Sequence, residues 1–238
     1  ATQNYGIVDI DLDRADAEIS LYLKGSDGGD LASQVVPLAD LAVRKRAPTL
    51  SAAVVSGERA YLFRGSEYVR VQPSSRRIDA GYPKLVREGW KGALPVARTE
   101  CEALGFDAVL PSAKRLYFFA GNGYTRYDLA RDRADSGYPL YIARHWKGLF
   151  AGDLCGVVPV GVVGGNTSEA TEAYFVSGSE CIRYDLKKDR AQPGYPRALS
   201  DEFSGCIEPG ERVQAAIGWV DGCVYFLCGE EWRCYDLA

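Results

Sequence analysis

One segment recurs four times along the chain, and this recurrence limits the folds open to it. Each copy has aromatic and apolar residues at alternate positions, then a glycine, then a second alternating run, which is the pattern of a β-hairpin with one buried face. The copies recur about every 55 residues, a period typical of repeat architectures. They read AYLFRGSEYVRV (60–71), LYFFAGNGYTRYDLA (116–130), AYFVSGSECIRYDL (173–186) and VYFLCGEEWRCYDLA (224–238), with the turn glycines Gly65, Gly121, Gly178 and Gly229.

A second motif follows each of the first three hairpins. It is Gly-Tyr-Pro, at 81–83, 137–139 and 194–196, and a large aromatic residue lies eight positions after its tyrosine, at Trp90, Trp146 and Phe203. Because proline lacks an N–H, it belongs on an edge strand or at the start of a short helix. We therefore predict an outer strand with a short helix after each hairpin.

Short runs of small and apolar residues precede the hairpins. They lie at 51–54, 107–110, 160–163 and 214–217, and small residues suit strands crowded around a central axis. Each unit then supplies an inner strand, a hairpin, and an outer strand with a helix. Four-stranded blades of this kind predict an all-β, four-bladed β-propeller, which leaves only short and protected sheet edges.

The order of these motifs resembles that of the hemopexin-like family over about residues 49–238. The shared pattern is a small inner strand, the hairpin Y-F-F-x-G-x-x-Y-x-R-Y-D, then G-Y-P and W-x-G. Single-domain members such as the plant seed albumin-2 proteins and the bacterial photopexins share it. The resemblance implies one propeller domain over 1–238, with repeats at about 49–100, 101–156, 157–210 and 211–238.

The pattern departs from four equal repeats at both ends of the sequence. The fourth unit reaches Asp236-Leu237-Ala238 without a Gly-Tyr-Pro motif. Because an unpaired strand edge invites aggregation, we expect residues of about 30–47 to close the last blade. Residues 1–29 are then an extra N-terminal segment with strand-like runs at 5–8 and 19–23, and a five-bladed ring that uses them is the alternative.

Composition narrows the classes of partner and compartment. A net charge of −4 argues against nucleic acid, and no run approaches the roughly 18 apolar residues of a membrane span. The absence of Met predicts a mature N-terminus left by signal-peptide removal. Seven cysteines and the sequon at Asn166 favour a secreted protein or a storage compartment, with Cys228 and Cys234 as candidates for a disulfide across the last hairpin.

The sequence contains no recognisable catalytic constellation. His145 is the single histidine, and its place beside Trp146 in an outer element indicates a solvated side chain. We therefore predict that the protein is not an enzyme. The repeated Arg70, Arg126 and Arg183 are interpreted as charge-assisted links between neighbouring strands or blades.

The resemblance also implies cofactors. Hemopexin-like rings carry cations on the central axis, held by backbone carbonyls and an inner-strand acid, so calcium or another cation is expected here. Only Asp107 keeps that acid, and the other units have Ser51, Val160 or Gly161, and Gln214 in its place. Haem is the second cofactor implied, and with one histidine it would be bound by His145, by a tyrosinate or by aromatic stacking.

Two functions from different classes follow from the sequence, with a third in reserve. The first is a non-catalytic binding protein that holds haem or a polyamine at the mouth of the channel, with dimerisation switched by the ligand. The second is a carbohydrate-binding lectin or defence protein that uses Trp219, Trp232 or the loop near Asn166. The third is a storage albumin with no specific ligand.

Overall fold

The structure is a computed structural model that describes residues 5–11, 18–24, 27–37, 50–93, 105–112, 114–160, 170–219 and 221–237. The chain forms two compact units, Ala1–Pro48 and Thr49–Ala238. This division differs from the single domain predicted over 1–238.

The N-terminal unit is a three-stranded antiparallel sheet in the order β1 (Tyr5–Asp11), β2 (Glu18–Lys24) and β3 (Asp30–Pro37). The strand-like runs at 5–8 and 19–23 thus form strands as expected. Residues 30–37, which were expected to close the last repeat, pair instead with β2 in this sheet. Residues 38–47 of the predicted closing segment lie outside the described residues.

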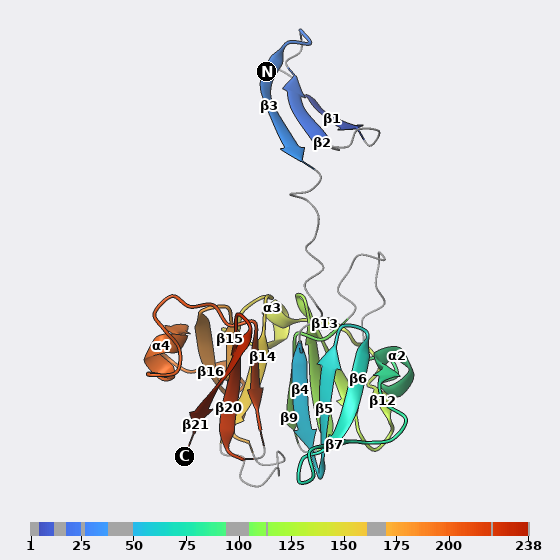
Figure 1. Cartoon of the computed structure of the whole chain (residues 1–238), viewed down its shortest axis with the longest axis vertical. Coiled ribbons are helices and arrows are strands. Elements are labelled where there is room, and N and C mark those ends of the chain that lie inside the picture. Colours follow the sequence, from blue (N-terminus) through green and yellow to red (C-terminus); the bar gives the residue numbers. More distant parts are fainter. Residues whose placement is uncertain are drawn as a thin grey trace. The chain divides into compact units, whose positions relative to one another are not determined.

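The C-terminal unit contains the four repeats in sequence order (Figure 1). The first comprises β4 (Ala52–Ser56), β5 (Arg59–Arg64), β6 (Glu67–Gln72), β7 (Arg77–Ile78), β8 (Lys84–Leu85) and α2 (Val86–Gly89). The second comprises β9 (Ala108–Ser112), β10 (Arg115–Ala120), β11 (Gly123–Asp128), β12 (Arg133–Ala134), β13 (Leu140–Tyr141) and α3 (Ile142–His145). The third comprises β14 (Gly156–Val160), β15 (Glu172–Ser177), β16 (Glu180–Asp185), β17 (Arg190–Ala191), β18 (Arg197–Ala198) and α4 (Leu199–Glu202). The fourth comprises β19 (Ala215–Gly218), β20 (Cys223–Cys228) and β21 (Glu231–Asp236).

Each repeat is built on the predicted hairpin. Its first three strands run antiparallel, and the turn glycines adopt positive φ, from 55° at Gly121 to 65° at Gly229, where a side chain would be strained. In the first three repeats two short strands pair with the third strand, and a four-residue helix follows the Gly-Tyr-Pro motif. The predicted outer strand and short helix are thereby confirmed.

The first strands of the repeats meet one another in cyclic order. β4 contacts β9, β9 contacts β14, β14 contacts β19, and β19 contacts β4. Two of them, β14 and β19, form a parallel ladder in which Gly156 lies opposite Ala216. A Cβ on Gly156 would lie 2.2 Å from the carbonyl oxygen of Ala216, so only glycine permits this approach of the two backbones.

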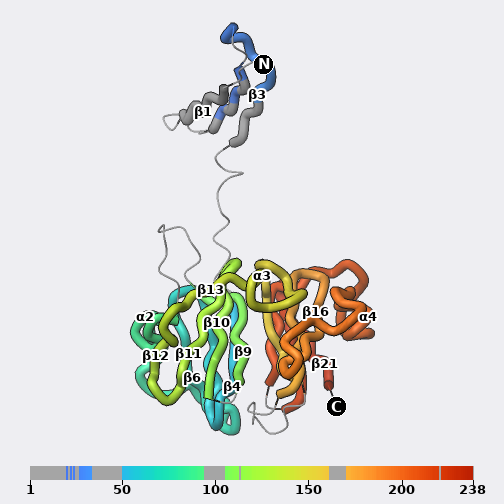
Figure 2. The backbone as a smooth tube through the Cα atoms, turned by 180° about the vertical axis from the view of Figure 1, so that it is seen from behind, coloured from blue at the N-terminus to red at the C-terminus, as the bar shows by residue number. Residues whose placement is uncertain are grey.

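The aromatic residue after each Gly-Tyr-Pro motif packs between its own repeat and the next, and we call these three residues the joint aromatics. Figure 2 follows the backbone through the repeats that they join. Trp146, for example, lies 5.6 Å from the ring of Tyr117 in its own repeat, and 5.5 Å and 5.3 Å from Phe175 and Tyr184 in the third repeat. Trp90 and Phe203 make the equivalent contacts, with Phe118 and Tyr127 and with Phe226 and Tyr235 respectively.

The fourth and first repeats meet through a different aromatic residue. Trp219, directly after β19, packs against a buried cluster of Val55, Ala60 and Val71 from the first repeat. The side chain of Trp219 is half-buried there. This packing covers part of the Trp219 side chain, which weakens its predicted role as an exposed sugar platform.

Candidate functional site

One residue position, immediately before each first strand, carries the predicted axial site. It is occupied by Ser51, Asp107, Cys155 and Gln214. Their backbone N–H groups donate hydrogen bonds of 2.8–2.9 Å to the carbonyl oxygens of Phe63, Phe119, Val176 and Leu227 respectively. The register therefore corrects the prediction for the third repeat, where Cys155 and not Gly161 is equivalent to Asp107. Gly161 itself lies outside the described residues.

Two of the side chains at this position bind the glycines of the hairpin turns. Asp107 Oδ2 accepts the N–H of Gly121 at 2.6 Å, and Gln214 Oε1 accepts that of Gly229 at 2.8 Å. Burial raises the pKa of the Asp107 carboxyl, because desolvation disfavours its charged form. Burial likewise raises the pKa of the Cys155 thiol to about 11, so that side chain stays neutral.

These residues do not fit a cation site built from side chains. Calcium takes six to eight oxygen ligands, and the axial position offers one carboxylate, which already accepts a hydrogen bond. The carbonyl of Cys155 accepts the N–H of Ala216 at 2.9 Å in the β14–β19 ladder. Within the described residues, no three His, Cys, Asp or Glu side chains are grouped so as to hold a metal.

The residue predicted to bind haem lies on the surface. His145 is exposed at the end of α3, and its ring lies 6.1 Å from that of Tyr124 at the outer side of the second repeat. It follows β13, which pairs with the third strand of the repeat, whereas Asp107 precedes the first strand. The structure therefore does not bring His145 together with Asp107 or its equivalents.

The disulfide predicted between Cys228 and Cys234 is contradicted by the strand register. Cys228 pairs with Glu231 across the hairpin, whereas Cys234 pairs with Tyr225. Cys234 is thus three residues away from the partner of Cys228, roughly 10 Å along the strand, and it points to the opposite face of the sheet. Cys228 is buried and Cys234 is exposed, so the two sulfurs cannot meet.

The repeated arginines form the predicted charge-assisted links, and each link lies within a repeat. In the second repeat, Arg126 Nε and Arg115 Nε lie 2.7 Å and 3.2 Å from Asp135 Oδ2. In the first repeat, Arg70 and Arg59 converge on Asp79 in the same way. These clusters join the second strand, the third strand and the first outer strand of a sheet.

The third repeat reverses this arrangement. Glu172 stands where the other two repeats have Arg59 and Arg115, because it lies opposite Asp185 as Arg115 lies opposite Asp128. Gln192 stands where they have Asp79 and Asp135. Arg183 therefore binds Glu172 directly, with 2.7 Å between Nε and Oε2, and Gln192 Nε2 donates to Glu172 Oε1 at 2.8 Å.

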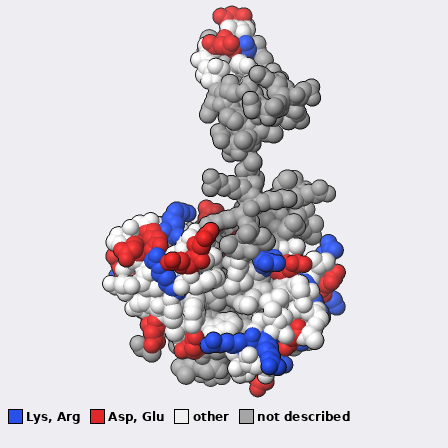
Figure 3. Space-filling model, in the orientation of Figure 1, with Lys and Arg blue, Asp and Glu red and all other residues white. Residues whose placement is uncertain are grey.

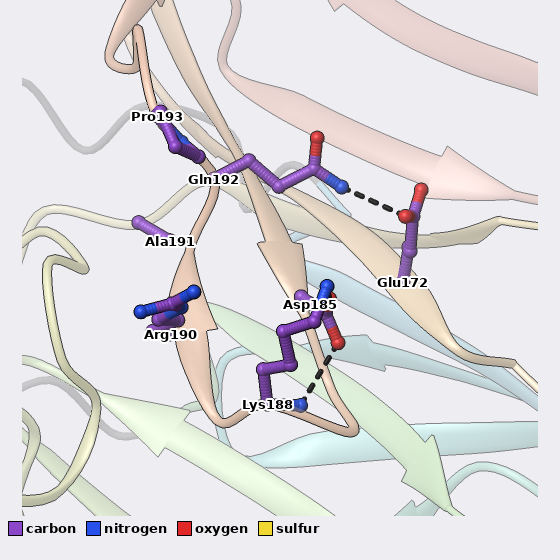
Figure 4. A pocket seen from close by; sticks show the side chains of 7 residues that line it. All are labelled: Glu172, Asp185, Lys188, Arg190, Ala191, Gln192 and Pro193. Atoms are coloured by element: carbon purple, nitrogen blue, oxygen red, sulfur yellow. Dashed lines mark hydrogen bonds and ion pairs between the residues drawn. The ribbon is translucent and has the colours of Figure 1, made fainter.

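A polar cleft of ≈ 250 Å³ lies beside this altered cluster (Figure 4). Glu172 comes from β15, Asp185 from β16, and Gln192 follows β17, so three neighbouring segments contribute to one site. Figure 4 shows the Gln192 amide reaching across to Glu172, and Lys188 bound to Asp185. The cleft is lined by Glu172, Asp185, Lys188, Arg190, Ala191, Gln192 and Pro193.

The charges of the cleft are held in fixed states and positions. Asp185 Oδ1 accepts the backbone N–H groups of Lys187 and Lys188, and the second of these bonds is the main cause that lowers the pKa of Asp185. Asp185 Oδ2 also binds Lys188 Nζ at 3.0 Å. Among the described side chains, none pairs with the exposed guanidinium of Arg190, which leaves its donors open.

On the coloured residues of the face drawn in Figure 3, basic and acidic side chains are interspersed. In the part of the chain that the structure describes, no helix has the length and apolar character needed to cross a membrane. Sequence reasoning noted the repeated Arg183 but missed Glu172 and Gln192. Both residues could have been found in the sequence, because they stand at the two positions of this cluster at which the third repeat differs from the first two.

Sequence comparison agrees with this all-β architecture of repeated hairpins and short outer helices. Residues 50–92 and 106–149 match the Hemopexin family, which confirms the resemblance that the sequence motifs indicated. Macrophage metalloelastase of Oryctolagus cuniculus is 32% identical over 102 residues, which are 42% of this chain and 20% of that protein. The chain thus spans about a fifth of the length of this relative.

Solved structures of plant proteins share the fold. The hemopexin fold protein CP4 from cow pea has a TM-score of 0.62 and 22% identity, covering 80% of this chain and 87% of that one. A plant lectin with two metal binding sites from Cicer arietinum has a TM-score of 0.62 and 23% identity over the same shares of the two chains. A plant albumin from Cicer arietinum showing hemagglutination has a TM-score of 0.61 and 22% identity, covering 78% and 85%.

Proposed function

We propose that this chain is a non-catalytic binding protein of the lectin type, and that the cleft of its third repeat binds a small polar ligand of the carbohydrate class. The observation that carries the proposal is the exchange, in this repeat alone among the first three, of an Arg and an Asp for Glu172 and Gln192. That exchange changes which side chains pair in the repeat, and the polar cleft lies beside the exchanged residues.

The chemistry of the cleft suits the hydroxyl groups of a sugar. Carboxylates accept hydrogen bonds from hydroxyls, while the Arg190 guanidinium and the Gln192 amide donate them. Because Arg183 and Lys188 already hold Glu172 and Asp185 in place, little side-chain ordering is required when a ligand binds. A volume of ≈ 250 Å³ lies below the roughly 300 Å³ at which drug-sized pockets begin, which favours a ligand as small as one sugar residue.

The proposal includes a closed four-bladed propeller as the scaffold. Its support is the cyclic contact of β4, β9, β14 and β19, together with the joint aromatics and the packing of Trp219 on the first repeat. Closure would fix the four sheets relative to one another and hold the cleft rigid. We also propose a secreted or stored protein, in line with the plant albumin and lectin neighbours.

The test is binding to a panel of monosaccharides and short glycans, measured by calorimetry on the full chain. The variant Glu172→Gln keeps the shape of the side chain but removes the charge, and we expect binding of the preferred sugar to fall at least about tenfold. Asp79→Asn changes the equivalent cluster of the first repeat and should leave affinity unchanged. Equal losses in both variants, or binding insensitive to Glu172→Gln, would contradict the assignment of the cleft.

Agglutination of red cells provides a second measurement, because it requires at least two sugar sites in one assembly. The homodimer predicted from the sequence is therefore part of the proposal, and light scattering of the purified protein would detect it. Agglutination that a simple sugar inhibits supports the lectin. A saturable haemin or polyamine titration without any sugar binding would overturn it in favour of a ligand at the axis.

A further inference from the structure

The fourth repeat differs from the first three at two positions that take part in their charged clusters. In its register, Cys223 lies opposite Asp236 as Glu172 lies opposite Asp185, and Cys234 lies opposite Tyr225 as Arg183 lies opposite Tyr174. Cys223 therefore occupies the place of Arg59, Arg115 and Glu172. Cys234 occupies the place of Arg70, Arg126 and Arg183. The two side chains that pair directly in the third repeat, Glu172 and Arg183, are therefore both replaced by cysteines here.

The third repeat shows that side chains at these two positions meet. Glu172 and Arg183 are diagonal neighbours on one face of the β15–β16 pair, and their side chains are joined at 2.6–2.7 Å. Cys223 and Cys234 have the same diagonal relation on β20 and β21. Their contact is a side-chain hydrogen bond, and this bond is the largest cause that raises the pKa of the Cys223 thiol to about 12.

We propose that Cys223 and Cys234 form a reversible disulfide, which in the fourth repeat takes the place of the direct Glu172–Arg183 link of the third repeat. This modification site is independent of the cleft in the third repeat. Cys234 is exposed and Cys223 is partly exposed, so both can react with a small reagent. The proposal also assigns Cys234 a partner other than Cys228, which lies on the opposite face of the sheet.

The oxidation proceeds by thiol–disulfide exchange with a small-molecule disulfide, for which oxidised glutathione is the probe. The thiolate of Cys234, the more exposed of the two, attacks one sulfur of the probe, forms a mixed disulfide and releases one glutathione thiolate. The thiolate of Cys223 then attacks the Cys234 sulfur and releases the second glutathione thiolate. Two protein thiols thus lose two protons and two electrons, and the probe takes up both electrons.

Peptide mapping tests the linkage directly on the full chain. The protein is equilibrated with oxidised glutathione, its remaining thiols are alkylated, and it is cut with trypsin without reduction. Trypsin cleaves after Arg212 and Arg233, so the peptide 213–233 holds Cys223 and Cys228 while the next peptide begins at Cys234. We expect these two peptides to be joined, and to separate when reduced glutathione is in excess.

Three variants distinguish the sulfurs. In Cys223→Ser the joined peptide disappears and Cys234 carries glutathione instead, whereas Cys228→Ser and Cys206→Ser leave the joined peptide at its original amount. A link that persists in Cys223→Ser, or that is lost in Cys228→Ser or Cys206→Ser, overturns the assignment. Circular dichroism of each variant confirms that it is folded, and free thiols at every glutathione ratio in the folded wild type would also overturn the proposal.

Discussion

Replacement of Trp146 by alanine is the sharpest test of how the repeats are held together. Trp146 is only 7% exposed and lies within 6 Å of five aromatic rings, three in its own repeat and two in the next. Burial of roughly 200 Å² at about 25 cal/mol per Å² is worth about 5 kcal/mol. Measured Trp→Ala substitutions in cores cost about 3–5 kcal/mol, which agrees with this figure.

The assay is urea unfolding followed by far-UV circular dichroism, because tryptophan fluorescence changes with the substitution itself. With a slope of about 2 kcal/mol per M, the loss lowers the urea midpoint by about 2 M. Trp146→Phe keeps a ring at the joint, as Phe203 does naturally in the third repeat, and should cost about 1–2 kcal/mol. Trp232→Ala removes a side chain that is 44% exposed and should shift stability by about 0.5 kcal/mol or less.

The reasoning is refuted if Trp146→Ala unfolds at the same urea concentration as Trp232→Ala. It is also refuted if Trp146→Phe costs as much as Trp146→Ala. Either result would mean that the ring packing between repeats contributes little to the free energy of unfolding.

Two further predictions concern the innermost strands. Since burial raises the pKa of Asp107, its contribution to stability is present when it is protonated and is lost as the pH rises through its folded pKa. The variant Asp107→Asn keeps an acceptor for the Gly121 N–H and carries no charge. It should therefore unfold at a higher urea concentration than the wild type at about pH 7, and this difference in midpoint should disappear at about pH 3. A gap that does not depend on pH would contradict this. Gly156→Ala should destabilise the fold by at least about 2 kcal/mol, because its Cβ would meet the backbone of Ala216. The control is Gly123→Ala, whose Cβ would lie 3.5 Å from its nearest neighbour, the carbonyl oxygen of Leu140. It should cost about 1 kcal/mol or less. Equal effects of the two glycine substitutions in thermal unfolding would remove the role assigned to the β14–β19 contact.

The sequence predicted the repeats well because their strongest signals are local. Alternation, a turn glycine and the Gly-Tyr-Pro motif each act within a dozen residues, so the hairpins, the outer strands and the short helices all appeared where expected. The inner strand of the third repeat was misplaced by several residues. The apolar run around Val157–Val160 continues into Gly161 and Val162, so local pattern alone does not fix where this strand begins.

The residues of the cleft and the cysteine pair depend on strand register, which local pattern does not provide. Glu172 and Gln192 are 20 residues apart and meet only because β15, β16 and β17 are neighbours. The disulfide was predicted from closeness to the turn, which ignored the face on which each side chain points. Alignment of Cys234 with Arg183 would have placed it opposite Tyr225 and excluded Cys228 from the sequence alone.

The position of the joint aromatics bears on how this protein unfolds. Each of these rings lies in one buried cluster that combines residues of two adjacent repeats, so no repeat has a complete core within its own boundaries. An array of self-sufficient repeats can lose its terminal members one at a time, whereas shared cores tie the opening of one repeat to that of the next. Amide hydrogen exchange in the first three repeats should accordingly report one common opening free energy, and the repeats should exchange as a single cooperative block.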